Sequence, residues 1–324
     1  MGPLASARPA AASAWPIIGQ DPELNLRALD EMKWAYRSPR LRALGFDFGV
    51  RASNRTVGRY LGELMRAFEA RGEPRHIYSF IDREHSPDAL YELYRGGEQV
   101  STTSSPSTML RHLLWDVNRS VVEETKDLLL FHASAIEHDG RAAVFPAPMG
   151  SGKTTLAARL VQRGLRYVTD EAVAIDPITL MVRPYPKPLG IDPGSWDVLS
   201  DLRPDVDGTL KPFLAEGWYV PPDAFREGAV APPCSPRFVI APRYERGTTT
   251  NLVEMRRSEA LIRLAENSFN IPAFGARRSM AILADVVRSA RCYRLTIGDL
   301  ADASTMVHEL LDTAHPHRTD EWVS

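Results

Sequence analysis

Hydrophobic residues along the chain follow two alternating patterns, one with the spacing of helices and one with the short apolar runs of strands. Apolar positions three and four residues apart predict helices, here over 57–68, 107–122, 153–163, 258–267, 280–290 and 301–313. Short segments dense in apolar residues predict strands, here over 76–81, 128–136, 142–145, 166–169, 238–241 and 293–297. The alternation of the two kinds of element predicts an α/β protein.

The length of 324 residues suggests two domains, since a domain averages roughly 150 residues. The pattern divides the chain into an N-terminal α/β domain, 21–125, and a larger domain, 126–312, with flexible tails predicted at 1–20 and 313–324. Residues 193–236 are rich in Pro, Asp and Gly, with two tryptophans among them. We expect this segment to be an insertion loop that lies over the functional site and stays outside the core.

Composition narrows the class of function. Hydrophobic residues make up 44% and charged residues 25%, which excludes a wholly disordered chain. The 39 basic and 41 acidic side chains give a net charge of −2, which argues against a nucleic-acid partner. Cys234 and Cys292 are too few for a disulfide framework or a thiolate metal site and favour a cytoplasmic location. No segment approaches the ~20 apolar residues of a membrane span, so we expect no membrane partner.

Lysine is scarce, because arginine supplies all but five of the basic residues: Lys33, Lys126, Lys153, Lys187 and Lys211. Each lysine therefore marks a position to test for a compact ammonium group. The segment 33–66 carries eight basic residues against two acidic ones. It either attracts an acidic peptide or a phosphate-bearing partner, or it is a solvated arginine-rich face.

The segment between the predicted strand 142–145 and the next helix matches the phosphate-loop pattern G-x-x-x-x-G-K-[ST], with Ala147 in place of the first glycine. The predicted nucleotide-binding residues are Ala147, Pro148, Met149, Gly150, Ser151, Gly152, Lys153, Thr154 and Thr155. The glycines let backbone N–H groups turn toward phosphate oxygens, and the start of the helix adds its positive dipole end. Lys153 would reach the phosphates and the Thr154 hydroxyl would bind Mg²⁺, with Thr155 as the alternative ligand. The competing interpretation is a glycine-rich turn before an ordinary surface helix.

An acidic pair, Asp170 and Glu171, ends the strand that follows the predicted helix. If that strand returns beside the loop, one carboxylate can accept a hydroxyl proton while its neighbour helps to hold the metal. The alternative is an acidic turn between two strands.

These motifs resemble those of the HPr kinase/phosphorylase superfamily, whose nucleotide fold is related to that of phosphoenolpyruvate carboxykinase. The similar stretches are FHASAIEHDG, which contains His132, then APMGSGKTT, then VTDE at 168–171. The chain looks most like HPr-kinase-related proteins of bacterial peptide-modification gene clusters, including lasso-peptide kinases. The resemblance implies that 126–312 is a P-loop kinase domain, with Asp170 as general base, Glu171 as metal ligand and His132 in the active site, orienting Asp170 or the phosphate.

Three features leave alternatives open. His132 shares a strand face with Leu130 and Ile136, so a core histidine is its other interpretation. Lys187 stands in YPKPLGI, where bifunctional family members carry a glutamate and an arginine; this departure argues against phosphorylase activity. Lys187 would then contact phosphate or acceptor, or be a solvated lysine. Arg277 and Arg278 are candidates for a phosphoryl clamp, or ordinary surface arginines.

Taken together, the motifs predict an ATP-dependent and Mg²⁺-dependent phosphotransferase. In this hypothesis Asp170, His132 and Lys153 act on the hydroxyl of a Ser or Thr in a peptide or small protein. Two rivals remain: a small-molecule kinase that uses the same loop, and a nucleotide-sensing module without catalysis. The resemblance also implies a homo-oligomer, while the choice between ATP and GTP is open.

Overall fold

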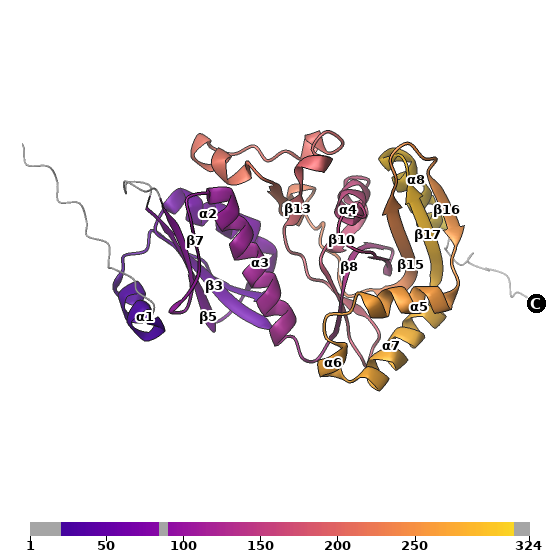
Figure 1. The fold of residues 1–324 in the computed structure, drawn as a ribbon, viewed down its shortest axis with the longest axis horizontal. Coiled ribbons are helices and arrows are strands. Elements are labelled where there is room, and N and C mark those ends of the chain that lie inside the picture. Colours follow the sequence, from indigo (N-terminus) through magenta and orange to yellow (C-terminus); the bar gives the residue numbers. More distant parts are fainter. Residues whose placement is uncertain (1–20, 84–89, 314–324) are drawn as a thin grey trace, which may run out of the picture.

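The computed structural model describes residues 21–83 and 90–313, and it has a mixed α/β architecture built on two main sheets (Figure 1). The α/β class predicted from the sequence is confirmed. The tails predicted at 1–20 and 313–324 lie outside the described residues, apart from Thr313 at the end of the last helix.

The first sheet is formed by strands of the N-terminal third of the chain. Its order is β4-β2-β3-β5-β6-β7, and β1 pairs with β3. The strands are β1 (Tyr36–Arg37), β2 (Arg40–Ala43), β3 (Phe46–Ala52), β4 (Glu69–Ala70), β5 (His76–Asp82), β6 (Tyr91–Arg95) and β7 (Glu98–Thr103). The accompanying helices are α1 (Pro22–Glu31), α2 (Arg55–Leu64) and α3 (Pro106–Glu124). The predicted helix 57–68 is interrupted at Met65 (φ −103°, ψ 7°) and continues as the 3₁₀ turn η1 (Arg66–Phe68).

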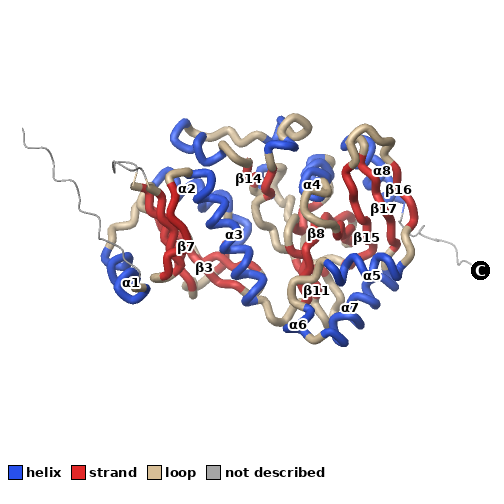
Figure 2. The backbone as a smooth tube through the Cα atoms, in the orientation of Figure 1, coloured by secondary structure: helices blue, strands red, loops and turns tan. Residues whose placement is uncertain are grey.

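The second sheet carries the predicted loop and has the order β12-β11-β8-β9-β15-β17-β16, with β10 paired to β8. Its strands are β8 (Leu129–His138), β9 (Arg141–Pro146), β10 (Arg166–Thr169), β11 (Ala172–Ile175), β12 (Val182–Arg183), β15 (Ser235–Tyr244), β16 (Asn251–Glu254) and β17 (Arg291–Ile297). Helices α4 (Lys153–Gln162) and α8 (Leu300–Thr313) cover one face, and α5 (Arg257–Glu266), α6 (Ile271–Phe274) and α7 (Ala276–Ser289) the other (Figure 2). The sheet is therefore apolar on both faces, which explains the continuous apolar runs of its strands.

Helix α3 joins the two sheets. Ser105 caps its first turn by accepting a hydrogen bond from the Thr108 N–H, and Pro106 occupies a position where its missing N–H costs nothing. The apolar stripe predicted over 107–122 is buried, with Leu110, Leu113 and Val117 among its members. These residues belong to the same core as the α4 face of the second sheet.

The basic segment 33–66 is partly structural. The Arg40 guanidinium lies 2.6 Å from the Asp47 carboxylate. Arg51 is buried and donates to Ser79 and to Asp30 on α1, while its guanidinium lies over the Trp34 ring. These contacts hold α1 and the first sheet together, so neither residue belongs to a solvated face.

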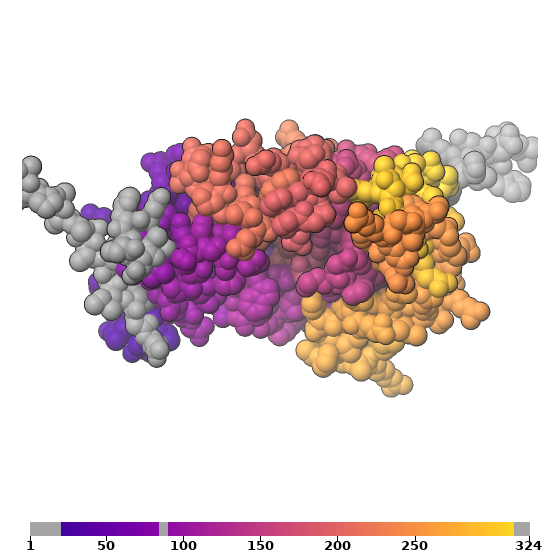
Figure 3. Space-filling view, turned by 45° about the horizontal axis from the view of Figure 1, so that its top comes forward, coloured from indigo at the N-terminus to yellow at the C-terminus, as the bar shows by residue number. Residues whose placement is uncertain are grey.

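The segment 193–236 does not stay outside the core, contrary to the sequence prediction. It contains η2 (Pro193–Ser195), η3 (Ser200–Leu202), η4 (Gly208–Leu214), β14 (Trp218–Val220) and η5 (Pro222–Ala224), and β14 pairs with β13 (Leu189–Ile191). Phe213, Leu214 and Trp218 are buried in the core shared with both sheets. Figure 3 shows the segment lying across the gap between the N-terminal part and the second sheet. Its apolar residues have no helical or alternating period, so a pattern analysis does not detect their burial.

Within the described residues, no helix has the length and apolarity that a bilayer crossing requires.

Phe213 anchors the segment 193–236 to the first sheet, because its ring packs against Phe80 and Tyr91 at centroid distances of 6.1 and 5.8 Å. We expect Phe213→Ala to lower the free energy of unfolding by about 3–5 kcal/mol, through lost burial and a residual cavity. Urea denaturation followed by circular dichroism measures this value. The control Ile178→Ala, at a side chain that is 87% exposed, should cost less than about 0.5 kcal/mol. A similar small loss for Phe213→Ala would show that the segment adds nothing to the core.

Candidate active site

The register of the second sheet brings the loop and the acidic pair to the same strand. On one side of β8, the pairing with β9 ends at Ala133 opposite Pro146, so the chain leaves the sheet there as the loop 147–152. On the other side, β11 pairs His132 with Ala172, and the Ala133 N–H donates to the Glu171 carbonyl at 3.2 Å. The loop and the acidic pair therefore flank His132 from opposite edges of β8.

Two glycines of the loop adopt the left-handed backbone conformation. Gly150 and Gly152 adopt positive φ values of +78° and +86°, a region that other L-residues rarely enter. No side chain caps the first turn of α4, nor those of α5, α6 and α7, whereas Asp21, Asn54 and Ser105 cap the first turns of α1, α2 and α3. The first N–H groups of α4 are thus left without a side-chain acceptor. The predicted order of strand, loop and helix is confirmed.

Lys153 folds back over the loop that precedes it. Its Nζ donates to the carbonyl oxygens of Ala147 and Pro148 at 2.7 and 2.8 Å, and the residue is 6% exposed. Burial lowers the pKa of Lys153, and the nearby charges of Glu171 and Asp170 oppose that shift without cancelling it. The lysine therefore lies within electrostatic reach of the acidic pair.

Other loop residues differ in their surroundings. Ala147 is buried and does not have positive φ, so the absence of glycine at this position causes no backbone strain. Met149 is 90% exposed, while the buried Ser151 hydroxyl has no hydrogen-bond partner. Thr155 Oγ1 lies 2.7 Å from Ser195 Oγ of the insertion, which leaves Thr154 as the threonine whose hydroxyl is available.

Asp170 is almost fully buried and is held by two groups. Its Oδ1 accepts a hydrogen bond from the Tyr167 hydroxyl at 2.9 Å and lies 3.2 Å from Lys187 Nζ. Burial raises the pKa of Asp170 above its ordinary value, although the Lys187 charge opposes the rise. Its carboxyl is thus a stronger base than an exposed aspartate.

Glu171 has a different environment from its neighbour. Its carboxylate lies 3.4 Å from His132 Nδ1 and 3.6 Å from Lys187 Nζ. Burial alone would raise the pKa of Glu171. The hydrogen bond from His132 and the charge of Lys187 outweigh burial and lower this pKa to about 2. The two adjacent carboxyls are therefore tuned in opposite directions, a pattern found where acid and base roles are divided.

His132 contacts Glu171 and not Asp170, the partner suggested by the resemblance. Its ring also packs edge-on against Phe269 at a centroid distance of 5.9 Å, and the backbone N–H of His132 donates to the Asn267 carbonyl. Residues 267–270 lie along the edge of β8 beyond the end of β9. There the Leu130 carbonyl accepts a hydrogen bond from the Phe269 N–H, and the Leu130 N–H donates to the Asn270 side-chain oxygen. The histidine therefore positions the glutamate of the acidic pair.

Lys187 is not a solvated lysine. Only 20% of its side chain is exposed, and it bridges Asp170 and Glu171. Burial by itself would lower the pKa of Lys187, but the two carboxylates raise it above its usual range. The ammonium thus stays charged at all physiological pH values.

Two tyrosines of the site were missed by the sequence analysis. The Tyr167 hydroxyl oxygen lies 2.9 Å from Asp170 Oδ1 and 3.1 Å from the Lys187 carbonyl oxygen, and the two acceptors share its single hydrogen. Tyr185 is buried and its ring stacks on Phe68, with centroids 5.7 Å apart, which joins the site to the N-terminal part of the chain. In the sequence, Tyr167 stands three residues before Asp170 and Tyr185 stands two residues before Lys187, each in an apolar context. This spacing was the feature from which the two tyrosines could have been predicted.

Arg277 and Arg278 are exposed at the start of α7, where the Arg278 guanidinium lies 4.6 Å from the Phe274 ring centroid. Among the described residues, neither forms an ion pair or hydrogen bond with the loop or the acidic pair. The structure therefore does not bring them into this site.

The described residues contain no ready-made group of three or more His, Cys, Asp or Glu side chains for a metal ion. Thr154 and Glu171 stay the Mg²⁺ ligands that the sequence analysis predicts. Comparison with protein-family models and with curated proteins gave no match. The geometry of the site and the motif resemblance are the basis for a functional hypothesis.

The ion pairs of Lys187 predict a pH-dependent effect on stability. Lys187→Met leaves two carboxylates near each other without their cation, which should cost about 3–5 kcal/mol at pH 8.5. The pKa of Asp170 then rises further, so protonation at pH 5.5 removes part of the repulsion and the loss becomes smaller. Thermal melts of variant and wild type at both pH values measure the difference.

The control for this prediction is Lys126→Met, at an exposed lysine, which should change the melting temperature little at either pH. An equal loss for Lys187→Met at pH 5.5 and 8.5 would contradict the proposed coupling between this lysine and Asp170.

Proposed function

We propose that this chain is an ATP-dependent phosphotransferase with an HPr kinase-like catalytic domain, related in fold to phosphoenolpyruvate carboxykinase. The acceptor is a seryl or threonyl hydroxyl of a peptide or small protein. One observation carries the proposal: in one sheet, a phosphate-type loop that follows β9 and an acidic pair that precedes β11 lie on the two sides of β8, and Lys187 bridges the two carboxylates. The motif resemblance adds to it.

Triphosphate binding would use donors that the loop leaves unoccupied. The uncapped N-terminus of α4 and the orphan Ser151 hydroxyl supply hydrogen bonds to anionic oxygens. Lys153 would exchange the carbonyl oxygens of Ala147 and Pro148 for phosphate oxygens, a charge-assisted contact that is stronger than the one it replaces.

Asp170 is the residue suited to accept the proton of the acceptor hydroxyl. Its burial raises its pKa toward the operating pH, which improves a general base, and Tyr167 fixes its orientation. Lys187 keeps it ionised in the resting state and would stabilise charge as the phosphoryl group transfers.

Thr154 and Glu171 fit the metal position. Glu171 remains ionised because its pKa is about 2, and Thr155 is already engaged with Ser195. When bound, Mg²⁺ would neutralise charge on the phosphate oxygens. His132 would hold the glutamate in place for this contact.

Asp170→Asn tests the base. We expect ATP binding within a factor of a few of wild type, because the loop is unchanged, and a rate of phosphoryl transfer reduced by about 10²–10⁴. Mass spectrometry of peptides and of small hydroxyl compounds, each incubated with ATP, measures transfer and separates a peptide kinase from a small-molecule kinase. The control Asp285→Asn, at an exposed acid on α7, should retain the wild-type rate. A wild-type rate for Asp170→Asn would refute the assigned base.

The metal ligand is tested by comparing the two threonines. Thr154→Ala should raise the Mg²⁺ concentration needed for half-maximal ATP turnover at least tenfold, because it removes a direct ligand. Thr155→Val should leave that concentration nearly unchanged and cost about 1 kcal/mol of stability through the lost bond to Ser195. The reverse order of effects in a Mg²⁺ titration would move the ligand to Thr155.

A further inference from the structure

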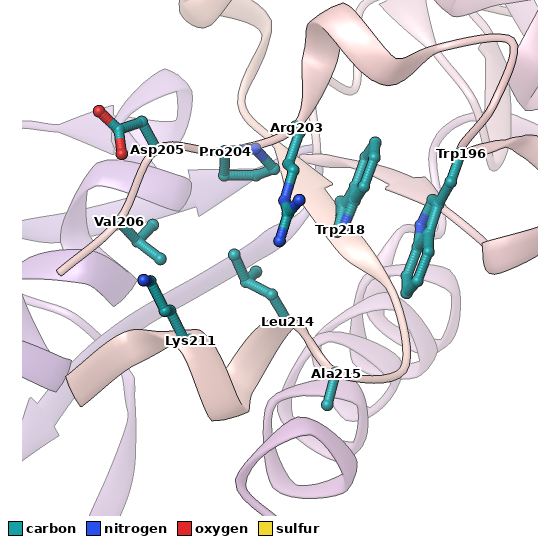
Figure 4. A pocket seen from close by; sticks show the side chains of 9 residues that line it. All are labelled: Trp196, Arg203, Pro204, Asp205, Val206, Lys211, Leu214, Ala215 and Trp218. Carbon is teal, nitrogen blue, oxygen red and sulfur yellow. The ribbon is translucent and has the colours of Figure 1, made fainter. Parts of the chain in front are cut away.

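A cavity of about 550 Å³ lies in the insertion, outside the carboxylate–lysine cluster (Figure 4). Trp196 and Trp218 form one wall with their rings stacked, the centroids 4.9 Å apart and the planes within 4°. Arg203 and Lys211 contribute their cationic side chains to the lining. We call this hollow the tryptophan cavity; its volume is in the range of sites that take small ligands or peptide side chains.

The tryptophan cavity has a surplus of positive charge. Among the described residues, neither Arg203 nor Lys211 forms an ion pair with a carboxylate. The one acidic lining residue, Asp205, directs its carboxylate away from Arg203 (Figure 4). The Asp207 carboxylate, which interacts with Lys211, already accepts a hydrogen bond from the Thr209 N–H. Two exposed cations beside apolar ring faces are suited to an acidic ligand with an apolar part.

The wall of the cavity is attached to the helix that follows the phosphate loop. Trp196 directly follows Ser195, whose hydroxyl bonds Thr155 in the first turn of α4. Further along this helix, the Gln162 side chain donates to Asp201 at 2.7 Å. The Arg159 guanidinium also donates to a carbonyl of the insertion. The cavity is thus held at a constant position relative to the loop.

The same wall is also connected, through Trp218, to the carboxylate–lysine cluster. On β14, Trp218 lines the cavity, while the next residue, Tyr219, interacts electrostatically with Lys187. Successive strand residues point to opposite faces, so the β13–β14 ribbon has the cavity on one face and Lys187 toward the other.

We propose that the tryptophan cavity binds an acidic segment of the acceptor peptide. Arg203 and Lys211 pair with its carboxylates, and the part of Trp196 that is exposed to the cavity packs on an adjacent apolar side chain. The acceptor role rests on the proposed function. This local site allows a chain of net charge −2 to select an acidic partner.

Three fluorescein-labelled peptides of equal length serve as probes, without Ser or Thr, in which a central Leu-Phe is flanked by Glu, by Gln or by Lys. Fluorescence anisotropy without nucleotide measures their binding to the full chain. We expect the Glu peptide to bind at least about tenfold more tightly than the Gln peptide, and the Lys peptide to bind most weakly. Equal affinities of the Glu and Gln peptides for the wild type would overturn the proposal.

The double variant Arg203→Ala/Lys211→Ala should abolish the preference for Glu over Gln. Trp196→Ala should weaken both peptides by a similar factor, because the ring contributes apolar contact only. The matched control Arg42→Ala/Arg288→Ala removes the same charge at side chains that are 58% and 71% exposed, and should keep the preference. A preference that persists in Arg203→Ala/Lys211→Ala, or disappears in the control, contradicts the assigned site.

Binding of a fluorescent ATP analogue to the same proteins separates this proposal from the proposed function. Absence of analogue binding to the wild type, with the peptide preference intact and dependent on Arg203 and Lys211, would refute the kinase and retain the acidic-peptide site. Loss of analogue binding in Arg203→Ala/Lys211→Ala, with peptide binding unchanged, would assign the cavity to the nucleotide and refute the acidic-peptide site.

Discussion

The ion pairs of Lys187 with Asp170 and Glu171 are the interaction on which the site depends. Two adjacent carboxyls in a largely buried position would repel each other and would also lose hydration, a cost of several kcal/mol for each charge. The single ammonium offsets both effects at distances of 3.2 and 3.6 Å. The sheet register sets the position of both carboxyls. The lysine that pairs with them lies in the segment between β12 and β13, so these ion pairs constrain the path of that segment.

The path of this segment connects three parts of the molecule. Just before Lys187, Tyr185 stacks on Phe68 of the N-terminal part; just after it, β13 begins and leads into the insertion. The insertion in turn packs on the first sheet through Phe213 and bonds α4 through Ser195. Through these contacts the N-terminal part and the insertion are both joined to the segment that carries Lys187.

In the structure the charges near the loop are nearly balanced without a ligand. The acidic pair faces Lys187, and Lys153 bonds loop carbonyls within electrostatic reach of the same carboxylates. A triphosphate would attract Lys153 out of the loop and add negative charge beside Asp170. The proposed kinase thus needs Mg²⁺ at Thr154 and Glu171 to restore the charge balance. The Mg²⁺ dependence of variants at Thr154 and Thr155 is therefore informative.

The sequence by itself determined the local elements: the strand–loop–helix around Lys153, the strand that ends at Asp170, most of the helices and most strands of the second sheet. In the first sheet it determined only β5. These follow from periodicity, from glycines that enter positive φ and from a motif of fixed spacing, all of which act between near neighbours in the chain. The tertiary structure alone decided that Lys187 joins the acidic pair, that His132 contacts Glu171, and that Phe213 and Trp218 are buried. Those outcomes depend on sheet register and on long-range packing, which place residues distant in sequence side by side and which no local pattern encodes.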